Sequence, residues 1–353
     1  MHAAVYRGRP QLELEDVEVP TLGPGEILVR VEACGVCGTD LKKIAHALVE
    51  PPRIFGHETA GTIAAVGEGV TRWKTGNRVA VNHHVPCMKP ECYFCRRKVY
   101  AQCPVYKKTG ATAGFAPAGG GFAQYVRVME WCAEHGTILI PDEISSEEAA
   151  FIEPLNTVLK GVMQARVQSG DTVLVVGQGP IGLLFTMLCV KLGARVIGSD
   201  LMPFRRQKSL ELGASAAVDP SSGGGRADVE HAIKQLSEGR GADLAVIAVP
   251  SAAIIAETMD YLRPGGTVLL FAHTRLDDLT RVDAGAVCML EKSLIGSYSS
   301  DIDLQQEAAD LIFSRQIDVR CLISDRVPLA DIQHAIDVAG RPRENSLKVI
   351  VIP

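Results

Sequence analysis

A glycine-rich loop, placed between an apolar strand and a helical segment, constrains the fold of this chain more than any other feature. Residues 173–176 are apolar and mostly β-branched, as expected of a buried strand. They lead directly into the pattern G-x-G-x-x-G, which here is Gly177-Gln178-Gly179-Pro180-Ile181-Gly182. The first glycine permits a tight turn, the second lets the backbone approach a pyrophosphate, and the third allows close packing of helix on strand. The N-terminus of the helix then faces the anion.

An acidic residue follows at the distance that such a loop requires. A second apolar strand, residues 194–198, ends just before Asp200, whose carboxylate can accept hydrogen bonds from ribose hydroxyls. The resulting prediction is a dinucleotide-binding unit with these cofactor-binding residues: Gly177, Gly179, Pro180, Ile181, Gly182 and Asp200. Asp200 would repel a 2′-phosphate and no arginine directly follows it, so we predict NAD rather than NADP. Arg205 and Arg206, slightly further on, are the alternative partners for a phosphate.

Composition and charge fit a protein of two domains that acts on small molecules. The chain has 353 residues, more than one hydrophobic core usually spans. Its net charge of −5 gives no reason to expect a nucleic acid or an anionic membrane as partner. The longest apolar helix candidate, residues 181–190, has about half the length of a membrane span. Residues 1–8 contain no apolar stretch before their charges, so we expect no secretory signal and a cytoplasmic protein with reduced thiols.

Four of the ten cysteines are clustered with the spacing C-x4-C-x2-C-x7-C, at Cys87, Cys92, Cys95 and Cys103. Residues 88–91 and 96–98 between them are polar or turn-forming and no helix or strand period runs through them, so we expect an irregular lobe at residues 87–103. Four thiolates on such a lobe suit a structural, tetrahedral Zn²⁺ that folds a loop lacking its own core. His83 and His84 are alternative ligands for one position. The other isolated cysteines, Cys132, Cys189, Cys288 and Cys321, are expected to be small buried hydrophobes.

Candidate ligands for a second metal lie far apart in the sequence. Cys37 follows a predicted strand at residues 27–33, and His57-Glu58 precedes another at residues 62–66. Glu153 stands at the start of a predicted helix. Three such ligands and a water are the pattern of catalytic zinc. The pair Cys34-x-x-Cys37 would also fit thioredoxin-like redox chemistry, which we disfavour because residues 38–40 indicate a turn without a following helix.

Together these motifs resemble the zinc-dependent medium-chain dehydrogenases/reductases, and within them the sorbitol (L-iditol) dehydrogenase-like branch. The matching motifs span nearly the whole chain: Cys34–Asp40, Gly56–Glu58 with Gly61, Val66-Gly67, the four-cysteine lobe, Glu153–Leu155, the loop 177–182 and Asp200. The resemblance implies an α/β fold with a Rossmann doubly wound parallel sheet and a mainly β GroES-like catalytic domain. The expected catalytic domain is 1–150, the NAD-binding domain 151–290, and residues 291–353 return to the catalytic domain.

The resemblance also implies roles around a catalytic zinc. Cys37 and His57 would bind the ion, and Glu153 or Glu58 would be the third or exchanging ligand. Asp40 would orient His57, as carboxylates commonly do for a ligating imidazole. Cys34 is not expected to be a ligand. With the ion of the cysteine lobe, the chain would hold two Zn²⁺.

The implied activity is oxidation of a secondary alcohol, in particular a polyol, by hydride transfer to NAD through a zinc-bound alkoxide. Thr39 would accept the hydroxyl proton, with Asp40 and Glu58 as the other catalytic residues. A threonine or simple-alcohol dehydrogenase with the same machinery is the alternative. A non-catalytic dinucleotide-binding protein is the alternative of a different class, but it would be expected to lose the catalytic ligands, which are all present here.

Three departures from the family pattern leave details open. The lobe begins Cys87-x4-Cys92, two residues longer than the usual C-x2-C. Lys42 stands where many relatives carry a proton-relay histidine, and a lysine relays protons only with a strongly lowered pKa. The alternative is a relay that ends in water or in the ribose hydroxyls. Polyol-oxidising relatives often carry an arginine in the region of residues 295–300, which here contains only serine and tyrosine as polar side chains.

The resemblance finally implies a homotetramer. The chain lacks the extra loop of the dimeric classical alcohol dehydrogenases, and its length is similar to that of commonly tetrameric relatives. We expect the strand at residues 267–272 and the segments after it to extend the cofactor sheet across a two-fold axis. A second contact is expected through the four-cysteine lobe.

Overall fold

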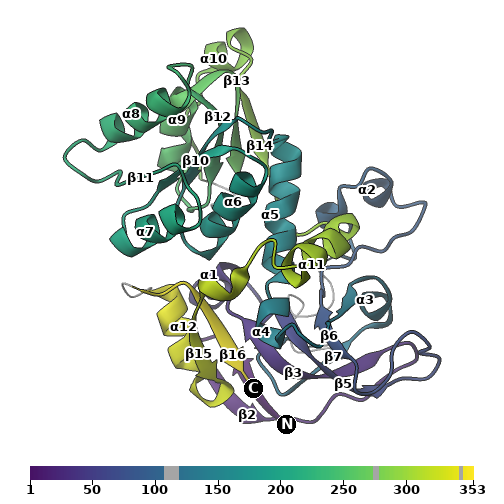
Figure 1. Ribbon diagram of the computed structural model, residues 1–353. Helices are drawn as coiled ribbons and strands as arrows, with labels where there is room; N and C mark the ends of the chain where they lie inside the picture. The colour runs from purple at the N-terminus through teal and green to yellow at the C-terminus, as the bar shows by residue number, and fades with distance from the viewer. Residues whose placement is uncertain (107–118, 273–277, 342–344) are drawn as a thin grey trace. The chain divides into compact units, whose positions relative to one another are not determined.

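Two compact units make up the protein, seen in a computed structural model that describes residues 1–106, 119–272, 278–341 and 345–353. The first unit joins Met1–Asn156 to Ser300–Pro353, and the second is Thr157–Ser299 (Figure 1). None of the helices that the structure describes combines the length and apolar character needed to cross a membrane.

The first unit is built on β-sheets. Among the described residues its larger sheet has the order β15-β16-β3-β5-β6-β8, with β7 also paired to β3. These strands are β3 (Ile27–Gly35), β5 (Glu58–Val66), β6 (Arg78–Val81), β7 (Tyr125–Val128), β8 (Thr137–Leu139), β15 (Ile323–Pro328) and β16 (Lys348–Ile352). A smaller antiparallel sheet contains β2 (Leu12–Asp16), β1 (His2–Tyr6) and β4 (Arg53–Ile54). β3 is almost wholly buried because β5, β7 and β16 all pair with it.

Short helices cover these sheets and their connections. They are α1 (Gly38–Ala45), α2 (Tyr93–Arg96), α3 (Glu130–His135), α4 (Ser146–Ala149), α11 (Gln305–Phe313) and α12 (Ile332–Gly340), with the 3-10 helices η1 (Tyr100–Gln102), η2 (Ile302–Leu304), η3 (Val319–Leu322) and η4 (Leu329–Asp331). The longer α5 (Ile152–Ala165) begins in the first unit and continues into the second. Its N-terminal turn therefore belongs with the sheets of the first unit.

The second unit contains a parallel sheet flanked by helices (Figure 1). Its strand order is β11-β10-β9-β12-β13-β14, formed by β9 (Thr172–Val176), β10 (Arg195–Ser199), β11 (Ala216–Val218), β12 (Ala242–Ile247), β13 (Leu262–Leu270) and β14 (Ser293–Gly296). The helices are α6 (Pro180–Lys191), α7 (Pro203–Glu211), α8 (Arg226–Leu236), α9 (Ala252–Tyr261) and α10 (Ala284–Met289). From β9 the chain first builds one side of the sheet and then the other, so the strand order reverses between β9 and β12. Ligands of such sheets bind beyond the carboxyl ends of the strands at that reversal.

Several local expectations are corrected by the structure. The expected strand at residues 267–272 begins already at Leu262, and β13 passes through Pro264 with a register shift against β12. Between Leu262 and Thr267 the pairing of β13 with β12 is therefore irregular. β14 pairs with β13 and forms the edge of the sheet, and the second unit extends to Ser299. Cys288 and Cys321 are exposed, in contrast to the buried Cys132 and Cys189.

Candidate active site and metal centres

The turn from β3 into α1 places Cys37. Its thiol caps the helix by accepting a hydrogen bond from the backbone N–H of Thr39 at 3.5 Å. The expectation of a turn without a helix at residues 38–40 is wrong, since α1 begins at Gly38. Thioredoxin-like chemistry is still disfavoured because Cys34 is fully buried, and burial raises the pKa of its thiol to about 12. Such a thiol is not a reactive thiolate.

Three potential zinc ligands meet at the end of β5. The ligand atoms of Cys37, His57 and Glu58 all lie within 4.8 Å of one another. His57 and Glu58 are buried, and Cys37 is partly exposed. Behind them, Asp40 places an oxygen 3.2 Å from Nδ1 of His57, which leaves Nε2 as the ring nitrogen for a metal.

The charges of this cluster fit a cation. Burial alone would lower the pKa of His57, but the Asp40 carboxylate and the Cys37 sulfur raise it well above its usual value. Burial alone would raise the pKa of the Asp40 carboxyl, but the neighbouring His57 lowers it below its usual value. A buried imidazole surrounded by anionic groups is the environment expected at a site for Zn²⁺, so these residues fit the ion.

Glu58 has a second partner besides the potential metal ligands. β16 lies beside the end of β3 and brings the ammonium group of Lys348 into an ion pair with the Glu58 carboxylate. The same ammonium donates to the carbonyl of Val36 at 3.2 Å. Burial raises the pKa of Glu58, and Lys348 opposes that effect. A metal ion and Lys348 would therefore share one buried carboxylate.

Glu153 lies close by but outside the three-residue cluster. It is buried in the first turn of α5, and its charge adds to the raised pKa of Glu58. Its Oε1 is 3.5 Å from Nδ1 of His84. Of the two glutamates proposed from the sequence, the structure thus brings Glu58 into the cluster and leaves Glu153 beside His84.

Sequence reasoning missed three buried polar residues at this site. Lys348 had no signal beyond a charge beside the apolar residues 349–352. His83 and His84 follow β6 directly, but we had considered them only as ligands of the cysteine lobe. His83 is 1% exposed, and neither of its ring nitrogens has a hydrogen-bond partner in the described part of the chain. Burial, with His84 and His57 nearby, lowers its pKa to about 3, so it is neutral at physiological pH.

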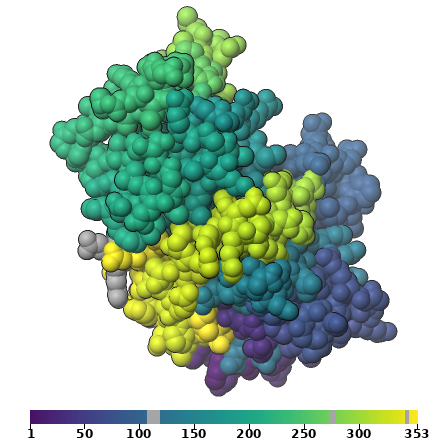
Figure 2. Space-filling model, in the orientation of Figure 1, coloured from purple at the N-terminus to yellow at the C-terminus, as the bar shows by residue number. Residues whose placement is uncertain are grey.

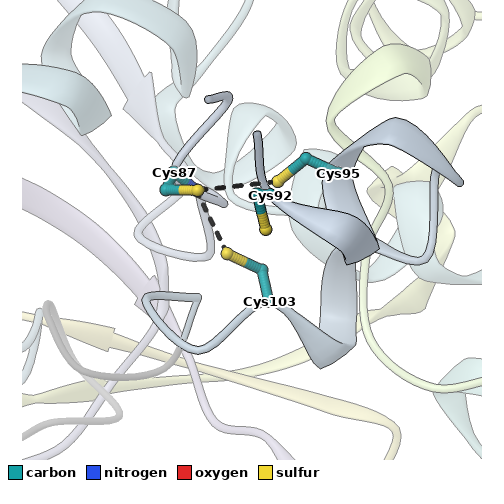
Figure 3. Close-up of side chains that lie close together, drawn as sticks. All are labelled: Cys87, Cys92, Cys95 and Cys103. Carbon is teal, nitrogen blue, oxygen red and sulfur yellow. Dashed lines mark hydrogen bonds between the residues drawn. The ribbon is translucent and has the colours of Figure 1, made fainter. Parts of the chain in front are cut away.

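The structure brings the four cysteines of the lobe together. Figure 3 shows their thiols converging on one space from the loop around α2 and η1. The Sγ atoms of Cys87 and Cys95 are 3.8 Å apart. A tetrahedron with zinc–sulfur bonds of about 2.3 Å has edges of about 3.8 Å, so the spacing fits Zn²⁺. The longer Cys87–Cys92 connection therefore does not remove Cys87 from the group.

The thiol of Cys92 in the lobe has a lowered pKa. The backbone N–H of Cys95 is the main cause that lowers the pKa of Cys92 to about 7. A thiol with this pKa readily gives up its proton to a metal.

The glycine-rich loop joins β9 to α6 in the second unit. Gly177 has φ +90°, and a Cβ at Gly182 would overlap the carbonyl oxygen of Gly177, so neither position accepts a side chain. Gly179 is the N-cap of α6, and Pro180 and Ile181 form its first turn. The N–H groups of this turn are free of intrahelical partners, as required for binding a phosphate.

Asp200 is held rigidly beside this loop. One carboxylate oxygen accepts from the N–H of Gln178 at 2.7 Å, and the other from the N–H of Met202 at 2.8 Å. Arg205 approaches Asp200 to 4.0 Å, while Arg206 forms an ion pair with Asp219 at 3.0 Å. The acid is therefore fixed in place, and Arg206 already has an acidic partner of its own.

Comparison with known proteins assigns the family. Residues 23–142 match the model described as the alcohol dehydrogenase GroES-like domain, and residues 180–314 match the zinc-binding dehydrogenase model. The chain is 30% identical to D-xylulose reductase A of Aspergillus oryzae, covering 94% of this chain and 91% of the relative. The chain belongs to the zinc-binding dehydrogenase family. The predicted fold class, a Rossmann sheet with a GroES-like domain, is confirmed.

Other relatives agree with this assignment. Sorbitol dehydrogenase of Bacillus subtilis is 29% identical over 100% of this chain and 97% of its own length. A zinc-binding dehydrogenase of Sinorhizobium meliloti, solved bound to NADP, has a TM-score of 0.87 and 30% identity, covering 100% of this chain and 99% of that one. The protein is an oxidoreductase of the alcohol dehydrogenase type, with zinc and a nicotinamide dinucleotide as cofactors.

Proposed function

We propose that this dehydrogenase oxidises a secondary hydroxyl group of a polyol with NAD⁺ and catalyses the reverse reduction with NADH. The observation that carries the proposal is the group of Cys37, His57 and Glu58, in which His57 and Glu58 are buried and Asp40 lies beside the ring of His57. The polyol class is supported by the sorbitol dehydrogenase and D-xylulose reductase relatives. Threonine and simple alcohols are the alternative substrates.

In this proposal the first unit is the catalytic domain and holds two zinc ions. Cys37 and His57 bind the catalytic ion together with Glu58 or Glu153, and the four lobe cysteines bind the structural ion. The catalytic ion, when bound, supplies a Lewis acid that lowers the pKa of the substrate hydroxyl. Asp40 holds the ring of His57 in the ligating orientation, and Lys348 opposes the rise that burial causes in the pKa of the Glu58 carboxyl.

The proton of the substrate leaves through Thr39 in our proposal. Thr39 lies in the first turn of α1, beside Cys37. Lys42 lies three residues further along the same helix face, and burial lowers its pKa. In this proposal Thr39 passes the proton towards solvent, and Lys42 stands in the place of a relay histidine.

The preference for NAD is proposed from Asp200. Its two oxygens are anchored to backbone N–H groups, so the carboxylate cannot turn away from a 2′-phosphate. Charge repulsion then disfavours NADP, although the Sinorhizobium meliloti neighbour was solved with it. Steady-state kinetics with NAD and with NADP test this, and a higher kcat/KM for NADP would contradict it.

We also propose a cytoplasmic homotetramer in which the exposed edge of β14 pairs with a second copy. Apolar side chains surround this edge without being covered: Val287, Met289, Leu290 and Leu294 are 38%, 83%, 42% and 38% exposed. Figure 2 shows the segment around α10, in light green, protruding from the second unit. Pairing at β14 would give hydrogen-bond partners to the unpaired backbone N–H and C=O groups of this edge strand, and it would cover the exposed apolar side chains. The second contact is proposed at the four-cysteine lobe.

A substrate panel tests the proposed activity. Sorbitol, xylitol, threonine and simple secondary alcohols are each offered with NAD⁺, and NADH formation is followed. The proposal expects the highest kcat/KM for a polyol. Activity confined to threonine or to monohydric alcohols would contradict the polyol assignment, but it would not contradict the proposed catalytic zinc site.

A further inference from the structure

We propose that Tyr106 and His84 hold the Glu153 carboxylate in place, so that the four-cysteine lobe positions a group of the catalytic centre. The inference rests on the proposed function, because it concerns the surroundings of the catalytic zinc. It assigns both residues as positioning residues, which act on the reaction through Glu153.

His84 contacts both the carboxylate and the proposed zinc ligand His57. Its Nδ1 lies 3.5 Å from Oε1 of Glu153, and its ring centroid lies 5.3 Å from that of His57. The residue is 4% exposed, so water does not compete for these contacts. Its backbone is also fixed, since its N–H donates to the side chain of Asn82 at 2.8 Å. His84 therefore has little freedom to leave Glu153.

Tyr106 covers the other side of His84. The two rings are stacked, with centroids 5.6 Å apart and an interplanar angle of 28°. Tyr106 is completely buried, and its hydroxyl lies 3.1 Å from the carbonyl oxygen and 3.0 Å from Oγ of Ser300. Both ends of the Tyr106 side chain are thereby fixed, and the ring prevents His84 from rotating away from the carboxylate.

The lobe in turn determines where Tyr106 lies. The N–H of Tyr106 bonds to the carbonyl of Cys103, a proposed zinc ligand, at 3.0 Å. Its ring belongs to the small apolar core formed with Tyr100 and Cys103, against which the other three lobe cysteines pack. This core is too small to be stable without the four sulfurs being held together. Zinc in the lobe therefore fixes Tyr106, which fixes His84 and, through it, Glu153.

Four variants of the full-length enzyme separate this role from a general loss of structure. Tyr106→Leu removes the stacked ring, and Tyr106→Phe keeps the ring but loses the hydroxyl. His84→Ala removes the contact to Glu153 and leaves every residue of the lobe core in place, although Tyr106 loses its stacking partner. Tyr100→Leu is the matched control, because Tyr100 lies in the same small core and its hydroxyl bonds to Asp303 rather than to the catalytic centre.

Each protein receives Co²⁺ at the catalytic site with zinc kept in the lobe. The ligand-field absorption of the cobalt, its dissociation constant and the lobe zinc content are measured, together with kcat and KM. Tyr106→Leu and His84→Ala are expected to change the cobalt spectrum and weaken cobalt binding about 10-fold, in the range known for groups that orient metal ligands. Tyr106→Phe keeps the stacked ring but loses its anchor on Ser300, so it is expected to change the spectrum less than Tyr106→Leu. Tyr100→Leu is expected to keep the wild-type spectrum.

The outcomes distinguish this inference from the proposed function. A wild-type cobalt spectrum in His84→Ala overturns the inference, even if Tyr106→Leu fails to fold. The same spectral change in Tyr100→Leu as in Tyr106→Leu also overturns it, because the effect is then a general one of the lobe. A wild-type protein that binds no cobalt at Cys37 and His57 contradicts the proposed function, and the inference with it.

Discussion

Replacement of Lys348 by methionine is expected to destabilise the first unit strongly. Methionine has a similar length but no charge, so the variant leaves the Glu58 carboxylate buried without its ammonium partner. Removing one member of a buried ion pair costs about 3–5 kcal/mol of unfolding free energy. At about 2–4 °C per kcal/mol for a domain of this size, the melting temperature should fall by roughly 10 °C.

The assay is calorimetric unfolding at pH 7.5 of protein freed of the catalytic metal, which would otherwise be an alternative cation for Glu58. Lys98→Met is the matched control, because the Lys98–Asp303 pair has side chains 72% and 38% exposed. Such exposed pairs contribute about 0–1 kcal/mol. The double variant Glu58→Gln/Lys348→Met removes both charges and should recover most of the loss. A Lys348→Met melting temperature no lower than that of Lys98→Met would refute the reasoning.

The same variant has a predictable pH dependence. Burial raises the pKa of Glu58, and this effect grows when Lys348 no longer opposes it. A carboxyl whose folded pKa lies above its unfolded value favours the folded state at low pH and loses that contribution as the pH rises through the folded pKa. The difference between Lys348→Met and wild type should therefore shrink as the pH falls from neutral towards the unfolded pKa of glutamate. A difference that widens over this range would contradict the assignment of Glu58 as the unpaired group.

Three further predictions concern the cofactor loop and the lobe. Asp200→Ala should narrow the preference for NAD over NADP, measured as the ratio of the two kcat/KM values, because the charge that repels a 2′-phosphate is removed. Gly182→Ala should weaken NAD binding in a fluorescence titration, since its Cβ would overlap the carbonyl of Gly177 and force α6 away from β9. Cys95→Ser should lower the zinc content by up to one ion per chain and lower the melting temperature, because the lobe would lose a ligand. An unchanged kcat/KM ratio in Asp200→Ala would contradict its role at the ribose, and unchanged NAD binding in Gly182→Ala would contradict the role of this glycine in the cofactor loop. An unchanged zinc content in Cys95→Ser would contradict Cys95 as a zinc ligand.

The cofactor unit was the most predictable part of the fold, because its signals are local. The strand before Gly177 and the helix after it were both found at the expected places. The edge strand β14 was missed because its residues Ser293–Gly296 are mostly exposed and show no burial pattern. Its assignment to the sheet depends on pairing with β13, which sequence periodicity cannot reveal.

The catalytic cluster was only partly predictable for the same reason. Cys37 and His57 stand in recognisable motifs, and the structure brings them together. Lys348 comes from a strand near the end of the chain and reaches Glu58 only because β16 pairs with β3. The place of His84 between Tyr106 and Glu153 could not be predicted, since it depends on tertiary packing.

The most direct test measures NADH formation from a polyol by wild type and by Cys37→Ala, after both proteins have been shown to bind NAD with equal affinity. We expect turnover of sorbitol or xylitol by the wild type and none by the variant, because the thiolate needed to hold the catalytic ion is gone while the cofactor unit is intact. Undiminished turnover by Cys37→Ala would contradict the proposed catalytic site.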